Sequence, residues 1–154
     1  MNVRNATFAD LGDICALIHE FFQQTSHGEL NGLPVTREGI LMSALQYVKN
    51  PHTLVLVGED TKDQHICGLF VAEMFHCLYN NSNYARDVIL YIRRGARAWL
   101  DNGLPLVDKW MKKYDATHLI VEPTKAKNNK ALARLLETRG FKMEGYVLRY
   151  GKTV

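Results

Sequence analysis

Cysteine and histidine, which build most disulfide and zinc centres, are sparse in this sequence and poorly placed for either role. The three cysteines, Cys15, Cys67 and Cys77, are odd in number, lie far apart and form no CxxC pair, which argues against a disulfide framework or a zinc site. The six histidines form no HExxH motif. We therefore expect no metal site, buried thiols, and a reducing, cytoplasmic compartment.

Long hydrophobic runs are missing as well. No apolar run approaches the ~20 residues that a membrane-spanning helix needs, and residues 1–10 lack the basic-then-apolar pattern of a signal peptide, so no membrane association is expected. The 154 residues are 47% hydrophobic and 23% charged, a balance that supports a buried core and argues against disorder. No repeat or linker divides the chain, so residues 1–154 are predicted to form a single domain.

Charge is unevenly distributed along the chain, although the net charge is only +3. Residues 1–77 carry 4 Lys or Arg against 9 Asp or Glu, a balance of −5. Residues 78–154 carry 15 against 7, a balance of +8. The basic half predicts an anionic ligand. Nucleic acid is disfavoured as that ligand, because the sequence shows neither an RNA-binding aromatic platform nor a helix-turn-helix signature.

Hydrophobic periodicity predicts elements in the order β-α-α-β-β-β-α-β-α-β. Thr36 is expected to cap the second helix, Pro105 to kink or restart the third near Leu104, and Gly140 to end the fourth. Strands are expected at residues 3–8, 52–58, 66–78, 87–92, 118–121 and 141–149, helices at about 10–22, 36–49, 98–114 and 128–139, and loops at 26–36 and 79–85.

The connections between these elements predict a mixed sheet with helices packed on it. The strands at 52–58 and 66–78 are joined by a short polar turn, which is typical of an antiparallel hairpin. The strands at 87–92 and 118–121 are joined through a helix, so they should be parallel neighbours.

The turn from the strand at 87–92 into the next helix has the composition of a phosphate-binding site. Gly95 and the small residues beside it allow backbone N–H groups to approach a ligand, and the helix N-terminus adds exposed amides and a partial positive charge. Arg93, Arg94 and Arg97 offer guanidinium forks for bidentate phosphate contacts. The turn therefore predicts a pyrophosphate site, with a solvated basic loop as the alternative interpretation.

Three local signatures, which follow one another along nearly the whole chain, resemble the GNAT superfamily of acyl-CoA-dependent N-acetyltransferases. The short loops resemble those of its small bacterial or viral members. The first signature is the opening strand and helix start at residues 3–11. The second is Arg-Arg-Gly-Ala-Arg-Ala at 93–98, similar to the family's Gln/Arg-x-x-Gly-x-Gly/Ala loop. The third is an asparagine, a helix and Gly-Phe at 129–141.

The resemblance implies an α/β (α+β) fold, namely a mixed, mostly antiparallel sheet of six to seven strands with about four helices packed on it. Its strands 4 and 5 would splay apart around acetyl-CoA, the co-substrate. The backbone of strand 4 would pair with the pantetheine arm, and the amide near Ile92 would polarise the thioester carbonyl. The cofactor-binding residues implied in this way are Leu90, Tyr91, Ile92, Arg93, Arg94, Gly95, Ala96, Arg97, Ala98 and Asn129.

The loop departs from the family's pattern. Ala96 stands where the family has its first glycine, and placing Gly95 there instead would put Ile92 at the Gln/Arg position. Near the next helix, Lys125, Lys127 and Lys130 would either bind the 3′-phosphate of coenzyme A or form a solvated loop.

The catalytic residues are less constrained. The family's usual acid is a tyrosine in the helix before Gly-Phe, and Leu136 occupies that place here. Tyr146 and Tyr150 are the nearby hydroxyl candidates. Glu122 and Glu73 are the candidate bases, each of which could instead be a solvated strand residue. Trp99 and Trp110 are expected in the core.

The resemblance places the amine acceptor, a small molecule or a protein, beside residues 26–36 and 79–84. The first segment includes Glu29 and belongs to the acidic half, which favours a cationic acceptor. Homodimers are common in the family, although no residue here indicates an interface. Two functions stay open: an active acetyl-CoA-dependent N-acetyltransferase, and a catalytically inactive fold relative that binds coenzyme A or a protein partner.

Overall fold

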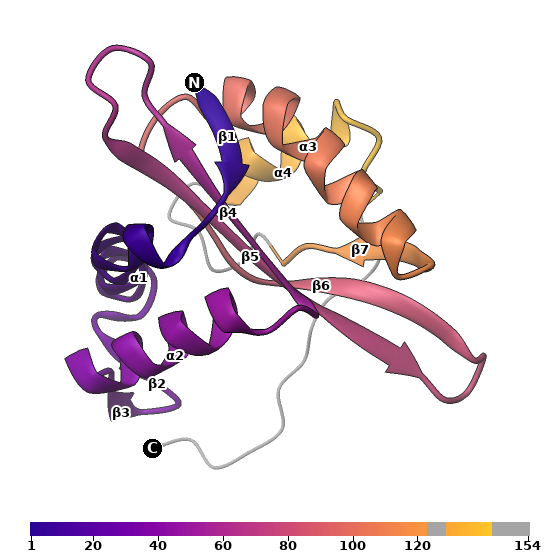
Figure 1. The fold of residues 1–154 in the computed structure, drawn as a ribbon, viewed down its shortest axis with the longest axis horizontal. Coiled ribbons are helices and arrows are strands. Elements are labelled where there is room, and N and C mark those ends of the chain that lie inside the picture. Colours follow the sequence, from indigo (N-terminus) through magenta and orange to yellow (C-terminus); the bar gives the residue numbers. More distant parts are fainter. Residues whose placement is uncertain (123–128, 143–154) are drawn as a thin grey trace.

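The structure is a computed structural model that describes residues 1–122 and 129–142. Within these ranges it contains helices on both faces of a central sheet and a small separate ribbon (Figure 1). The elements are β1 (Asn2–Asn5), the 3-10 helix η1 (Phe8–Asp10), α1 (Leu11–Ser26), β2 (Glu29–Leu30), β3 (Leu33–Pro34), α2 (Arg37–Lys49), β4 (Thr53–Glu59), β5 (Ile66–Cys77), β6 (Ser82–Ile92), α3 (Ala96–Lys113), β7 (Ala116–Ile120) and α4 (Asn129–Glu137).

The central sheet has five strands in the order β1-β4-β5-β6-β7 in the described part of the chain. β1, β4, β5 and β6 pair antiparallel, whereas β6 and β7 pair parallel through α3. This arrangement confirms the predicted hairpin, the predicted parallel crossover and the predicted mixed, mostly antiparallel sheet. The expected final strand at 141–149 lies largely outside the described residues.

One face of the sheet carries α1 and α2 (Figure 1). The periodic apolar run of α1 buries Ile14, Leu17, Ile18 and Phe21 against it. Helix α2 starts as predicted, because the Thr36 hydroxyl accepts the Gly39 N–H at 3.0 Å. Two α2 residues, Ile40 and Ala44, are buried. Leu41, which follows Ile40 directly, is 46% exposed, because only a narrow stripe of this short helix reaches the sheet.

The opposite face carries α3 and α4 (Figure 1). Helix α3 is continuous through Pro105, so a fresh helix start near Leu104 is wrong. Burial on both sides of the proline holds the two halves against the sheet, through Trp99 before it and Trp110 after it. Both tryptophans are therefore core residues, as predicted. Gly140 follows α4 with a positive φ of 87°, the conformation in which glycine commonly ends a helix.

Two segments expected as loops contain paired strands. Residues 26–36 hold the short β2–β3 ribbon, in which Glu29 pairs with Pro34. β6 starts at Ser82 rather than near residue 87, because the hairpin turn is confined to residues 78–81. Asn81 adopts a positive φ of 52° there, a conformation that asparagine tolerates better than most residues. The long β5–β6 hairpin therefore extends beyond the helices (Figure 1).

The cysteines are all free thiols, as expected. Cys67 is buried, whereas Cys15 and Cys77 are only half-buried, so the prediction of three buried thiols is wrong for two of them. Of the helices in the described ranges, none combines the length and the apolar content needed to cross a bilayer.

Candidate functional site

The site begins where β6 leaves its neighbour β7. The two strands pair from Asn83 with Ala116 to Arg86 with Ile120, and no pair follows in the described part of the chain. β6 itself continues to Ile92 and stays paired with β5. The splay expected between the fourth and fifth strands of the fold, which are β6 and β7 here, stays a prediction, because the chain after Glu122 lies outside the described residues as far as Asn129. On the β7 side, the second half of β6 has no strand partner among the residues that the structure describes, and we refer to this side as its free edge.

A cavity of about 290 Å³ lies against this free edge. Leu90, Tyr91 and Ile92 of β6 line it, together with Ala96 at the start of α3. α1 contributes three further lining residues, among them Phe21, and α4 another three, among them Leu135. Four of the ten residues predicted to bind a cofactor are therefore brought together around one cavity.

The turn after β6 is shaped by Gly95, which caps the N-terminus of α3. Its φ of 74° lies in the left-handed region, which glycine adopts without steric cost. A Cβ atom at this position would lie 2.9 Å from Cε of Met1, so the flexible Met1 side chain would have to shift to accept a larger residue. The Arg93 N–H donates to the Cys67 carbonyl at 2.8 Å and anchors the other side of the turn. The first turn of α3 consequently starts at the cavity wall.

The three arginines of the turn do not form a free cluster. Arg93 forms an ion pair with Glu20 of α1, with its Nε 2.9 Å from the carboxylate. Arg94 lies 3.0 Å from both Asp60 and Asp63 in the β4–β5 turn. These hydrogen bonds raise the pKa of both guanidinium groups, and the pKa of Glu20 is lowered chiefly by its hydrogen bonds from Arg93.

Arg97, by contrast, is exposed and has no ion-pair partner among the residues that the structure describes. The basic half of the sequence therefore meets the acidic half at this turn, through Arg93 and Arg94. Of the three predicted phosphate contacts, Arg97 alone is available without first breaking an ion pair.

A polar network connects the turn to the cavity. The Tyr91 hydroxyl donates to Glu20 Oε2 at 3.1 Å and accepts from Gln24 Nε2 at 2.8 Å. Burial, and then the hydrogen bond to Glu20, raise the pKa of Tyr91, so the phenol keeps its proton at neutral pH. Sequence reasoning missed Glu20 and Gln24. Both lie at the polar border of the α1 apolar stripe, and no local signal shows that they face β6.

Leu136, at the place of the family's usual tyrosine, is 4% exposed and packs in the α3–α4 core. An acid at this position is therefore absent. Tyr146 and Tyr150 lie outside the described residues, so their candidacy stays a prediction.

The two candidate bases lie near each other, on either side of β6. Glu73 of β5 is the register partner of Arg86, and Arg86 forms an ion pair with Glu122, just after β7. The Glu122 N–H also donates to the Asp87 carboxylate at 3.0 Å. His76, which alternation separates from Glu73, instead bonds Asn83 at 2.8 Å. Glu122 is thus held at the point where β7 ends, beside the gap.

The structure describes only some of the remaining predicted site residues. α4 begins at Asn129, and Lys130 is exposed on its first turn. Lys125 and Lys127 lie outside the described residues. Glu29, the acidic residue expected at the acceptor rim, is exposed on β2.

Comparison with known proteins gives the fold. No protein-family model and no curated protein matches the sequence. The crystal structure of a probable acetyltransferase matches with a TM-score of 0.75 at 12% identity, covering 100% of this chain and 98% of that one. An aminoglycoside 6'-N-acetyltransferase from Acinetobacter baumannii matches with a TM-score of 0.74 at 19% identity, covering 99% and 98%.

A ribosomal-protein-alanine N-acetyltransferase from Brucella melitensis biovar Abortus 2308 matches with a TM-score of 0.62 at 10% identity, covering 97% and 100% of the two chains. This chain has the GNAT fold. The GNAT resemblance found in the sequence is confirmed at the level of the fold, over the full length of the chain. Because all these identities are low, the acceptors named for these structures remain properties of those proteins.

Proposed function

We propose that this protein is an N-acetyltransferase that moves the acetyl group of acetyl-CoA to a primary amine by direct attack. The observation that carries the proposal is the cavity at the free edge of β6. It borders Leu90, Tyr91 and Ile92 on one side and the start of α3 on the other. The amide groups of a pantetheine arm can pair with such an edge as an added strand does. The helix N-terminus beside it suits the pyrophosphate.

The phosphate groups of acetyl-CoA would meet three arginines that differ in whether a carboxylate already pairs with them. Arg97 can contact them directly. Arg93 and Arg94 would have to exchange the carboxylates of Glu20 and the two aspartates for phosphate oxygens. This exchange keeps each guanidinium group in a charge-assisted interaction, while the carboxylates that it releases are partly exposed and can be solvated by water.

In the reaction, the amine nitrogen attacks the thioester carbonyl carbon. A C–N bond forms, the C–S bond breaks, and coenzyme A leaves as its thiolate. The free backbone N–H groups near Ile92 would stabilise the oxyanion. Glu122 or Glu73 would take the proton of the amine, directly or through water. Tyr91 is the phenol in the cavity wall, and its hydroxyl, which donates to Glu20 in this structure, would protonate the thiolate.

A second candidate function is supported by two observations. Leu136 removes the family's usual acid, and the ion pairs of Arg93 and Arg94 satisfy the phosphate loop internally. Both fit a catalytically inactive protein that binds coenzyme A or a protein partner. The acetyltransferase and the inactive coenzyme A binder differ in turnover and not in cofactor binding.

Calorimetric titration with acetyl-CoA, followed by a thiol-release assay with a panel of amines and proteins, tests the proposal. We expect saturable binding and thiol release that depends on an amine. Tight binding with no release on the whole panel supports the inactive protein instead. No binding of acetyl-CoA would contradict the acetyltransferase and the inactive coenzyme A binder, and would favour an inactive protein that binds a protein partner.

A further inference from the structure

The turn between β6 and α3, the proposed phosphate site, is matched by carboxylates from elsewhere in the chain. Its three arginines are cations, but Arg93 pairs with Glu20 of α1. Arg94 pairs with both Asp60 and Asp63 of the β4–β5 turn. Three positive and three negative charges among these six side chains sum to zero. The β6–α3 turn therefore presents little of the positive charge that its sequence carries to an approaching phosphate.

The carboxylate of Glu20 occupies one whole edge of the Arg93 guanidinium group. Arg93 Nε donates to Glu20 Oε2 at 2.9 Å, and Nη2 donates to Oε1 of the same carboxylate. A guanidinium group binds two oxygens of a phosphate with this same bidentate geometry. On the opposite edge, Nη1 donates to the Ile66 carbonyl at 3.4 Å. Glu20 thus takes the place that two phosphate oxygens could occupy on Arg93.

Glu20 is also held from its other side, by residues of the cavity wall. The Tyr91 hydroxyl donates to Glu20 Oε2 at 3.1 Å and accepts from Gln24 Nε2 at 2.8 Å. Tyr91 and Gln24 both line the cavity. Because Glu20 belongs to the folded chain and keeps this hydrogen bond, its effective concentration beside Arg93 stays high. A phosphate must therefore compete with a carboxylate that cannot diffuse away.

An exchange of partners at Arg93 needs only side-chain movement. The backbone is fixed before and after the turn, where the Arg93 N–H donates to the Cys67 carbonyl at 2.8 Å and the Trp99 N–H donates to the Gly95 carbonyl at 2.9 Å. The side chains of Arg93 and Glu20 are 39% and 37% exposed, so water can solvate either one after they separate. Because partly exposed ion pairs are weak, the competition is modest and reversible.

We propose that Glu20 is an internal competitor of the cofactor: its carboxylate occupies Arg93 in the free protein, and a phosphate group of acetyl-CoA displaces it. The contact is autoinhibitory, because it lowers the affinity for every ligand that binds this turn through phosphate. Coenzyme A carries the same phosphates as acetyl-CoA, so the return of Glu20 to Arg93 also favours release of the product. The identity of the ligand rests on the proposed function, whereas the competition of a carboxylate with a phosphate rests on the ion pair.

The opposite role, in which Glu20 holds Arg93 ready for a phosphate, is disfavoured by charge. A phosphate on the remaining edge of Arg93 would share one guanidinium group with the Glu20 carboxylate. Two like charges that close together repel each other, so the bound anion would be less stable than on a free arginine. The charge of Glu20 therefore opposes phosphate binding on either edge of Arg93.

Calorimetric titration of Glu20→Gln with acetyl-CoA and with coenzyme A tests the proposal. The amide keeps the side-chain shape and can still accept from Tyr91, but it is not an anion. We expect both dissociation constants to fall by the same factor, about two- to fivefold, since the ion pair that is removed is partly exposed. The urea midpoint of the variant should fall slightly. Affinity and stability then change in opposite directions, whereas a purely structural role of Glu20 would lower both.

Unchanged binding in Glu20→Gln overturns the proposal. Weaker binding also overturns it, and would show that Glu20 prepares Arg93 for the phosphate. Binding that tightens for acetyl-CoA but not for coenzyme A contradicts it as well, because the two ligands carry the same phosphates.

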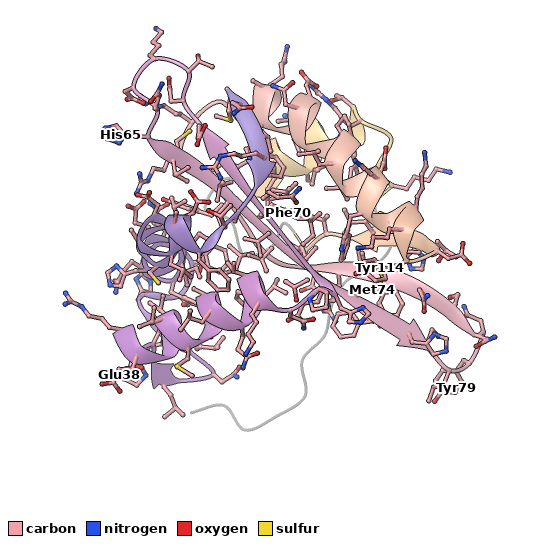
Figure 2. The ribbon with its side chains drawn as sticks, in the orientation of Figure 1. Glu38, His65, Phe70, Met74, Tyr79 and Tyr114 are labelled. Atoms are coloured by element: carbon pink, nitrogen blue, oxygen red, sulfur yellow. The ribbon has the colours of Figure 1, made fainter. Side chains whose placement is uncertain are left out.

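Two further variants test whether the effect belongs to the charge at this turn. Asp63→Asn should tighten binding less than Glu20→Gln, since Arg94 keeps a second carboxylate partner. Glu38→Gln is the matched control, because Glu38 is an exposed acid on α2, far from the β4–β5 turn that ends beside His65 (Figure 2). It should keep the parent affinity. Equal tightening in Glu38→Gln and Glu20→Gln would reflect net charge alone and would overturn the proposal.

Inorganic pyrophosphate separates this proposal from the proposed function, because it carries phosphate charge without a pantetheine arm. If acetyl-CoA does not bind but pyrophosphate binds Glu20→Gln more tightly than the parent, the proposed function fails and the internal competitor stands. If acetyl-CoA binds and reacts but its dissociation constant is equal in both proteins, the internal competitor fails and the proposed function stands. If neither ligand binds either protein, both proposals fail.

Discussion

The two faces of the sheet are covered to different extents. On one face, α3 and α4 cover the strands and bury Trp99, Leu100 and Val107 almost completely. On the other face, α1 and α2 cover only the half of the strands nearer the cavity and leave Phe75 and Ile120 exposed. The first face supplies stability through closed packing. The second leaves the surface where a ligand can reach the free edge of β6.

The largest effect is expected on the closed face. Trp99 is 1% exposed, and a Cβ at Gly58 would lie 2.6 Å from its Cδ1, so the ring fills its space completely. Trp99→Ala should lower the free energy of unfolding by about 3–5 kcal/mol. Urea unfolding measures this. Tyr79→Ser at the hairpin tip is the control, since Tyr79 is fully exposed, and should change stability by less than about 0.5 kcal/mol. Similar losses in both variants would remove the contrast between the faces.

The second prediction concerns how the half-covered face is anchored. Asp10 accepts two hydrogen bonds from Arg4 at 2.8 Å each, and these lower its pKa to about 2. Its folded pKa lies below the unfolded value of about 3.9. The stabilisation is therefore fully present above pH ~5 and is lost as the pH falls towards 2, amounting to about 2 kcal/mol.

Asp10→Asn should remove most of this pH dependence and lower stability at neutral pH. Chemical unfolding of the variant and the parent at pH 7, 4 and 2.5 measures both effects. Asp13→Asn, an exposed substitution in the next turn, is the control. The assignment would be contradicted if the parent and Asp10→Asn lost stability in parallel on acidification.

The third prediction concerns the edge between the two faces. Gly95→Glu places a side chain at a positive φ, near Met1 and at the mouth of the phosphate site. Acetyl-CoA binding should weaken at least tenfold, about 1.4 kcal/mol, in calorimetric titration. Gly12→Ala has open space around its Cβ and should keep the parent affinity. An unchanged affinity in Gly95→Glu would remove the phosphate-site assignment.

The smallest effects are expected for Arg93, which is ion-paired with Glu20, and for Arg97, which has no ion-pair partner among the described residues; the two should differ in their effect on stability. Arg97→Ala should weaken acetyl-CoA binding severalfold and leave the unfolding free energy unchanged. Arg93→Ala should also lower stability, by less than about 1 kcal/mol, since the Glu20 pair is partly exposed. Calorimetry and urea unfolding on both variants measure the two effects. A stability loss in Arg97→Ala would show that Arg97 has a structural role.

Local patterns predicted those parts of the fold that depend on neighbours within about one turn or one strand. The Thr36 cap, the β4–β5 hairpin and the parallel β6–β7 crossover were each expected and are each present. The extra length of β6 and the β2–β3 ribbon were not, because their residues are polar and pair only after the partner strand is in place. The fresh helix start predicted near Leu104 was wrong for a related reason, because packing of α3 on both sides of Pro105 outweighs the local cost of a proline inside a helix.

The candidate site divides in the same way. Of its backbone elements, the glycine turn was predicted from small residues and their position before a helix, whereas the free edge of β6 was expected only from the family resemblance. The side-chain contacts of the site were not predicted, because Glu20 and Arg93 are 73 residues apart and neither segment carries a pattern that indicates the other as its partner. The stacked rings of Phe75, Tyr84 and His118 likewise come from three strands, and each ring alone is an ordinary strand residue.

The sequence by itself determined the order of the elements, the glycine turn at Gly95 and the division into an acidic and a basic half. These follow from backbone preference, apolar periodicity and charge count, all of which are local or additive. Only the tertiary structure decided that the acids of the first half neutralise Arg93 and Arg94. It also decided that, within the described part of the chain, Arg97 has no ion-pair partner and α1 and α2 leave half of their sheet face uncovered. Those outcomes depend on which side chains meet across strands and helices, and such meetings are set by packing of the whole chain.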